Sequence, residues 1–161
     1  MSNFRGLVSS ATITRPSNTT AYAANDVIAT GTSSSEFAGL SANVGGGGII
    51  QSAVIVSSNN ATTKLSCDLL LFSEAQVTAA DNAAYAPTDA MMLTLVGSIS
   101  FATGSWLAAN AGSAAAGNAY CVAVNCGIAL SQDTLYGVLV ARNAYTPVSD
   151  EVFTIKLFSR Y

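Results

Sequence analysis

The side chains that perform most enzymatic chemistry are scarce in this sequence. Its 161 residues include six Lys or Arg, nine Asp or Glu and no histidine. Charged residues therefore make up 9% of the chain, whereas soluble domains average about a quarter. Without histidine, a Ser-His-Asp or Cys-His nucleophile lacks its general base. A Ser–Lys dyad would need Lys64 or Lys156, and both lie in segments patterned as strands, where a solvated lysine is expected.

The remaining candidate groups do not form a recognisable site. The acidic residues show no catalytic carboxylate motif, and no Lys-Ser/Thr follows the glycines at 45–48, so a loop is expected there rather than a phosphate site. Cys67, Cys121 and Cys126 complete no four-ligand zinc site unless a carboxylate joins them. We expect them to behave as small buried hydrophobic residues. The sequence predicts no enzyme and no catalytic, cofactor-binding or metal site.

Charge and hydropathy exclude two further classes of partner. The net charge is −3 and the basic residues are scattered, which argues against nucleic-acid binding because phosphate contact needs clustered cations. No run approaches the roughly 20 apolar residues that span a bilayer. The N-terminal residues lack the apolar segment of a signal peptide. We expect a protein that is made and used, or assembled, in a cytoplasm.

Short strands are the elements that must position these residues. Residues 1–15 are predicted to form an extended N-terminal arm, because 7–14 is rich in β-branched residues and Arg15 precedes a proline. Residues 16–161 are predicted to form a single β-sandwich domain. Its expected strands are 27–30, 49–57, 64–73, 96–101, 119–125, 134–141 and 151–159.

Two details refine this expectation. Strand 64–73 is apolar on both faces, which predicts a central position covered on both sides. Short helical turns are expected after Ser73 and after Pro87, the second with Thr88 or Asp89 as its N-cap. The segments 31–48 and 106–117 are predicted to be loops. The fold class is therefore all-β, a jelly-roll-like β-sandwich of about eight short strands with one or two helical turns.

Trp106 is the only tryptophan and begins an Ala- and Gly-rich segment. One interpretation is that its side chain anchors this loop to the core. The other is that it contacts a partner, because tryptophan is favoured at interface hot spots and aromatic rings stack on sugars.

Two segments of the chain carry a resemblance to a known family. They are ITRPSNTTAYAANDVI at 13–28 and LYGVLVARNAYTPVSDEVFTIKL at 135–157. The segments resemble small virion proteins of tailed bacteriophages, encoded beside the major capsid protein, which decorate the head. Where that family often has a Ser-Gly turn, this chain has Ser149 and Asp150.

The resemblance implies a decoration, or cement, protein that binds the outside of the phage head and stabilises contacts of the major capsid protein. It implies a homo-oligomer, a trimer or alternatively a dimer, located on the virion exterior and assembled in the host bacterial cytoplasm, without a cofactor. The arm would add a strand to a capsid edge, with Phe4 as an apolar anchor and Arg5 as a charge contact. The candidate capsid or oligomer contacts are Phe4, Arg5, Leu7, Arg15 and Trp106. The alternative is a tail or fibre component, or a carbohydrate-binding sandwich, with its site around Trp106.

Overall fold

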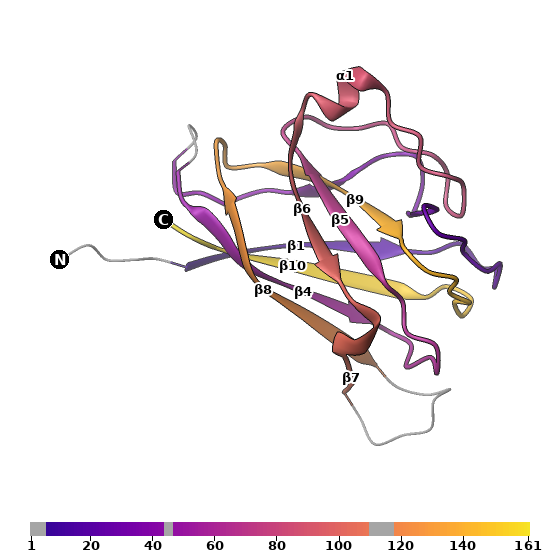
Figure 1. Cartoon of the computed structure of the whole chain (residues 1–161). Helices are drawn as coiled ribbons and strands as arrows, with labels where there is room; N and C mark the ends of the chain where they lie inside the picture. Colours follow the sequence, from indigo (N-terminus) through magenta and orange to yellow (C-terminus); the bar gives the residue numbers. More distant parts are fainter. Residues whose placement is uncertain (1–5, 44–46, 110–117) are drawn as a thin grey trace.

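The chain folds into two antiparallel β-sheets that pack face to face (Figure 1). The computed structural model describes residues 6–43, 47–109 and 118–161. The first sheet has the strand order β1 (Gly6–Thr14), β10 (Val152–Arg160), β4 (Ile49–Ser57), β8 (Ala119–Ala129) and β7 (Trp106–Ala108). Every pairing in this sheet is antiparallel.

The second sheet faces the first across the core. Its strand order is β2 (Val27–Ile28), β9 (Leu135–Ala141), β5 (Cys67–Phe72) and β6 (Leu95–Phe101), and β3 (Ser35–Phe37) also pairs with β9. Ile28 lies opposite Leu139, and Ser35 lies opposite Gly137. Because β2 and β3 bond to neighbouring parts of β9, they act together as one interrupted edge strand.

The path of the chain between the sheets is that of a jelly roll. With β2 and β3 counted as one strand and the short β7 left aside, eight strands remain in the described residues. The first, third, sixth and eighth form one sheet, and the second, fourth, fifth and seventh form the other. This alternation is the double Greek key of jelly-roll domains. The prediction of an all-β, jelly-roll-like sandwich is confirmed.

The predicted N-terminal arm is extended over residues 6–14, and there it is a strand of the sandwich. β1 pairs with β10 over its whole length, from Gly6 opposite Arg160 to Thr14 opposite Val152. Its alternate residues Ile13 and Ala11 face the core. Residues 1–5 lie outside the described part of the chain.

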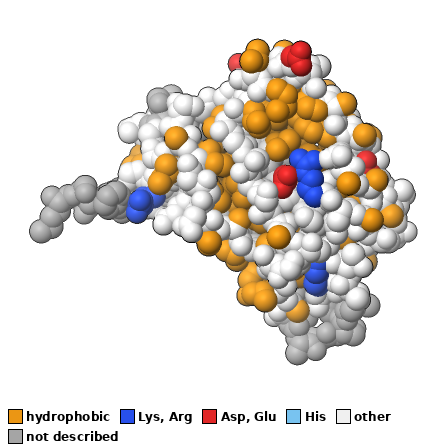
Figure 2. Space-filling view, viewed as in Figure 1, with side chains coloured by type: hydrophobic (Ala, Val, Ile, Leu, Met, Phe, Trp, Pro, Cys, Tyr) orange, Lys and Arg blue, Asp and Glu red, His pale blue; other side chains and the backbone are white. Residues whose placement is uncertain are grey.

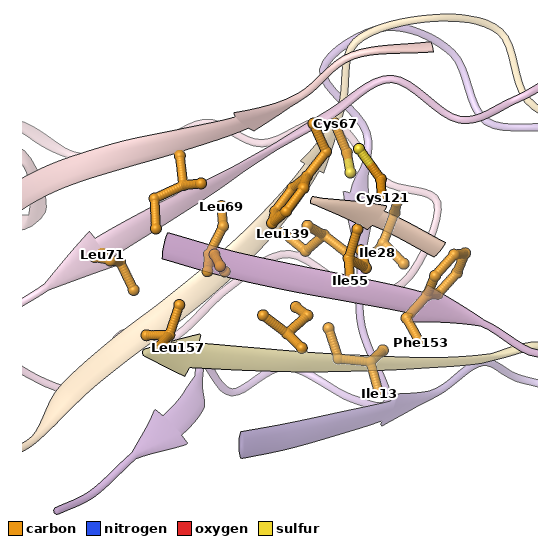
Figure 3. Close-up of a cluster of buried hydrophobic side chains, with 14 of the residues drawn as sticks. Ile13, Ile28, Ile55, Cys67, Leu69, Leu71, Cys121, Leu139, Phe153 and Leu157 are labelled. Carbon is orange, nitrogen blue, oxygen red and sulfur yellow. The ribbon is translucent and has the colours of Figure 1, made fainter. Parts of the chain in front are cut away.

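Alternating apolar side chains of both sheets fill the core (Figure 3). In β10, Phe153, Ile155 and Leu157 are fully buried, as the sequence pattern predicts. In β5, Leu69 and Leu71 face the core between the sheets, while Phe72 belongs to a second apolar cluster on the other side of the strand. The predicted two-sided burial of this segment is confirmed.

Helical structure in the described residues is limited to α1 (Asp89–Met92) and the 3₁₀ turn η1 (Thr103–Ser105). The Thr88 hydroxyl accepts a hydrogen bond from the Met91 N–H at 3.3 Å, which confirms the predicted N-cap. The helical turn predicted after Ser73 is wrong. There the backbone of Gln76 exchanges hydrogen bonds with Ser34, which holds the segment extended.

Neither a membrane-spanning helix nor a metal-binding cluster is found in the described residues. Within residues 6–43, 47–109 and 118–161, no helix is long and apolar enough to cross a membrane. Across the same ranges, no three or more His, Cys, Asp or Glu side chains gather as a metal site.

Candidate functional site

β1 is an edge strand whose outer side has no neighbouring strand in the described sheet. Its nine residues include no charged residue and no proline. Proteins usually protect long edge strands with charges, prolines or bulges, because unpaired N–H and C=O groups otherwise recruit another strand. β1 has none of these devices between Gly6 and Thr14. It is therefore a candidate site for the addition of a strand from a partner.

A hollow of about 310 Å³ lies beside this edge, between β1 and the strands β2 and β3. Its lining is rich in hydroxyl groups, including those of Thr12, Thr30, Ser33, Ser35 and Thr78. Thr78 is 8% exposed, and its hydroxyl has no hydrogen-bond partner. Buried polar groups are normally paired, so this buried, unpaired hydroxyl is an exception beside the hollow.

The end of β1 is fixed by a buried ion pair. Arg15 follows the strand directly, and its guanidinium lies 3.0 Å from Asp81 Oδ2. The Tyr22 hydroxyl donates to Asp81 Oδ1 at 2.5 Å and accepts from Arg15 Nε. Arg15 also lies over the Tyr22 ring, 4.7 Å from its centroid. These contacts join three loop segments at one end of the sandwich.

A second buried carboxylate continues this network. Glu151 is fully buried and accepts hydrogen bonds from the Ser57 hydroxyl at 2.5 Å and the Tyr145 hydroxyl at 2.7 Å. Backbone hydrogen bonds from Arg15 N–H to Glu151 C=O and from Tyr22 N–H to Tyr145 C=O link the two parts. The two segments that carry the phage resemblance are therefore joined in space.

Burial decides what this network can do chemically. It raises the pKa of Tyr22 and Tyr145 above the ordinary tyrosine value, and the neighbouring carboxylates raise it further. Both hydroxyls therefore stay protonated and act as hydrogen-bond donors. With Arg15 and Glu151 at most 1% exposed, the network holds the loops and the end of β1 in place.

The structure separates the predicted contact residues. Phe4 and Arg5 lie outside the described residues. Leu7 is half-buried at the start of β1, where it borders a surface hollow of about 490 Å³. Arg15 lies in the buried network and Trp106 is 8% exposed, so both are positioned inside the fold.

Trp106 anchors the chain to the core. Its indole Nε1 donates to the Leu65 carbonyl at 2.6 Å, and it pairs with Cys121 across β7 and β8. With 8% of its surface exposed, the ring offers no open face on which a sugar could stack. The interpretation of Trp106 as a core anchor fits this geometry.

The cysteines and lysines that could have supplied reactive groups occupy ordinary structural positions. Cys67 and Cys121 are buried on opposite sheets and point toward one another across the core (Figure 3). Burial raises the pKa of both thiols and that of Cys126. Lys64 donates to Asn60 Oδ1, and Lys156 is exposed on β10.

Sequence reasoning named the segment 1–15 but missed the hollow beside it. Two stretches of the sequence help form the walls of this hollow and its neighbouring edge: the uncharged residues 6–14 and the hydroxyl-bearing residues 32–35. Neither pattern reveals that the two lie side by side, because that depends on how β3 returns to β9.

Comparisons with known proteins give only distant likenesses. No protein-family model matches the chain, and no curated protein matches it. Among solved structures, a chain of the Cyanophage Pam1 capsid asymmetric unit is 11% identical with a TM-score of 0.42, over 98% of this chain and 85% of that one. A chain from the capsid of Ralstonia phage GP4 is 15% identical with a TM-score of 0.41, over 98% and 83%.

A chain from the acid-stable capsid of Helicobacter pylori bacteriophage KHP30 is 12% identical with a TM-score of 0.34, over 98% of this chain and 93% of that one. At such low identities and TM-scores these likenesses assign no function.

Proposed function

We propose that this chain is a structural protein of a tailed-phage virion, a decoration protein that binds the outer surface of the head. The observation that carries the proposal is β1, a nine-residue uncharged edge strand. The hydroxyl-lined hollow beside it and the resemblance of segments 13–28 and 135–157 to head-decoration proteins also support it.

The contact is the addition of a capsid strand to β1. In this mode, main-chain hydrogen bonds provide affinity and the pockets for alternate side chains provide specificity. Phe4 and Arg5 precede β1 directly in the sequence and extend the contact. Arg15 and its buried partners hold the other end of the strand, so they position the site without touching the capsid.

The proposed partner is the major capsid protein, whose subunit contacts the decoration protein stabilises on the virion exterior after assembly in the host bacterial cytoplasm. A homo-oligomer, a trimer or alternatively a dimer, suits this role. Several β1 edges held in one particle bind a repeating lattice with an avidity far above that of one edge.

The competing proposal of a carbohydrate-binding or tail-fibre module depended on an accessible Trp106. The indole is buried and bonded to the Leu65 carbonyl. No observation on the described residues favours that function over head binding.

Charge added to the edge of β1 tests the proposal. Ser10 and Thr12 are exposed on β1, and a Ser10→Lys/Thr12→Lys variant should bind purified, expanded empty heads about tenfold more weakly or worse, a loss of about 1.4 kcal/mol. The matched control is Ser98→Lys/Ser100→Lys, at two exposed serines on β6, an edge strand of the other sheet. Equal binding by both variants and the wild type would overturn strand addition at β1.

A further inference from the structure

The outer surface of the first sheet is apolar over its central strands. Side chains alternate between the core and this surface along each strand. We define the open sheet face as the outward residues Val54, Val56, Leu107, Tyr120, Val122, Val124, Lys156 and Phe158. Val124 is 65% exposed and Leu107 is 56% exposed. Exposed apolar side chains that adjoin one another in this way are typical of an interaction site.

The charge of this surface is of one sign. The five strands of the first sheet contain two charged residues, Lys156 and Arg160. None of the nine acidic residues of the chain lies in these strands. Lys156 is exposed, and no hydrogen-bond or ion-pair partner accompanies it within the described residues. The open sheet face therefore suits an apolar partner that carries carboxylates.

The same chain presents such a surface around α1. We define the acidic tip as Glu74, Val77, Asp89, Met92 and Leu93. Leu93 is 88% exposed and Val77 is 80% exposed. The Gln76 side chain donates to Thr94 Oγ1 at 3.0 Å and so holds the loop of Glu74 against the end of α1. Acidic and apolar atoms lie together at this end of the molecule (Figure 2).

The two surfaces belong together across different copies of the chain. α1 and β7 lie at opposite ends of the molecule, so the tip of a chain does not reach its own open sheet face (Figure 1). Pairing of two open sheet faces with each other would bring in Lys156 from each copy, and the residues of neither face include a carboxylate to offset it. The acidic tip of another copy supplies both the apolar side chains and the opposite charge.

We propose that the acidic tip of one copy binds the open sheet face of the next, in a head-to-tail contact between copies of this chain. Such a contact is heterologous, so it closes into a ring or continues as a filament. Head binding uses the main-chain edge of β1, whereas this contact uses side chains of β4, β7, β8 and β10. The two contacts adjoin, because Ser10 lies opposite Lys156 in the sheet.

Charge reversal in the full-length chain tests the contact by sedimentation velocity without phage heads. Glu74→Lys and Lys156→Glu, both at exposed positions, should each weaken self-association at least fivefold. The double variant, in which positions 74 and 156 exchange signs, should recover to within about twofold of the wild type. Ser100→Glu, on the other sheet, should leave association unchanged.

A mixing experiment separates a head-to-tail contact from a symmetric one. Leu93→Ser disables the tip and Val124→Ser disables the face, so each variant alone should be monomeric. An equimolar mixture retains one intact tip and one intact face and should form a dimer. The proposal is overturned if the wild type stays monomeric up to millimolar concentration, if either charge reversal has no effect, or if the mixture stays monomeric. Head binding by such a monomer would leave the proposed function standing.

Discussion

At the scale of single residues, two tyrosines show how this chain uses its few charges. Tyr22 and Tyr145 are almost fully buried, and each donates its hydroxyl hydrogen to a carboxylate, Asp81 or Glu151. Through these contacts each tyrosine holds its loop to a neighbouring segment. The pairing of Tyr22 with Asp81 could not be foreseen, because the two residues are 59 positions apart along the chain.

The raised pKa of these tyrosines predicts a loss of stability in alkali. In the unfolded chain a tyrosine ionises near pH 10, whereas burial keeps Tyr22 and Tyr145 protonated in the fold. The stabilisation is therefore complete below about pH 10 and declines as the pH rises above it, by about 1.4 kcal/mol per pH unit for each tyrosine.

Urea unfolding between pH 9 and pH 11 measures this decline. Tyr22→Phe removes one ionisable group. Above pH 10 it should therefore reduce the slope of unfolding free energy against pH by up to about 1.4 kcal/mol per pH unit. A slope unchanged in that variant would show that Tyr22 ionises equally in both states.

At the scale of elements, Gly137 shows what the antiparallel pairing of β3 with β9 requires. A Cβ on Gly137 would lie 2.7 Å from Phe37 Cε2 and 2.9 Å from Leu69 Cδ1. Both neighbours are fully buried, so neither side chain has free space into which to move. Only a glycine lets β3, β9 and β5 pack as closely as they do.

Gly137→Ala should therefore lower the free energy of unfolding by about 1–3 kcal/mol, the usual cost of overpacking a core. Gly104→Ala is the matched control, because a Cβ there meets nothing within 4 Å. Denaturant unfolding of both variants measures the difference. Similar stabilities for the two variants would mean that β3 moves away from β9 without cost.

Strands were predictable from the sequence where apolar and polar residues alternate within the strand itself. The strand at 49–57 was predicted with the bounds of β4, and the alternation of 151–159 gave the buried face of β10. β3 and β7 were missed because three residues carry no readable period. The pairing of β3 with β9 is also non-local, with Ser35 opposite Gly137. The wrong helical turn after Ser73 has the same cause: tertiary pairing of Gln76 with Ser34 overrides a local capping pattern.

At the scale of the whole molecule, the few charged residues are unevenly distributed between the interior, the first sheet and the edge strand β1. Arg15, Asp81 and Glu151 are used inside the fold, Lys156 and Arg160 lie on the first sheet, and β1 carries no charge at all. The sequence composition could not say which strand forms the sheet edge, because that follows from the jelly-roll path.

Hydrogen–deuterium exchange of β1 on phage heads tests the central proposal most directly. The Thr14 N–H donates to Thr30 Oγ1 at 3.0 Å. The other amides of β1 that point away from β10 lie on its free edge, so they should exchange fast in the free protein. On binding to expanded heads, these amides should become strongly protected while the amides of β6 change little. Stable head binding with unchanged exchange in β1 would contradict strand addition at this edge.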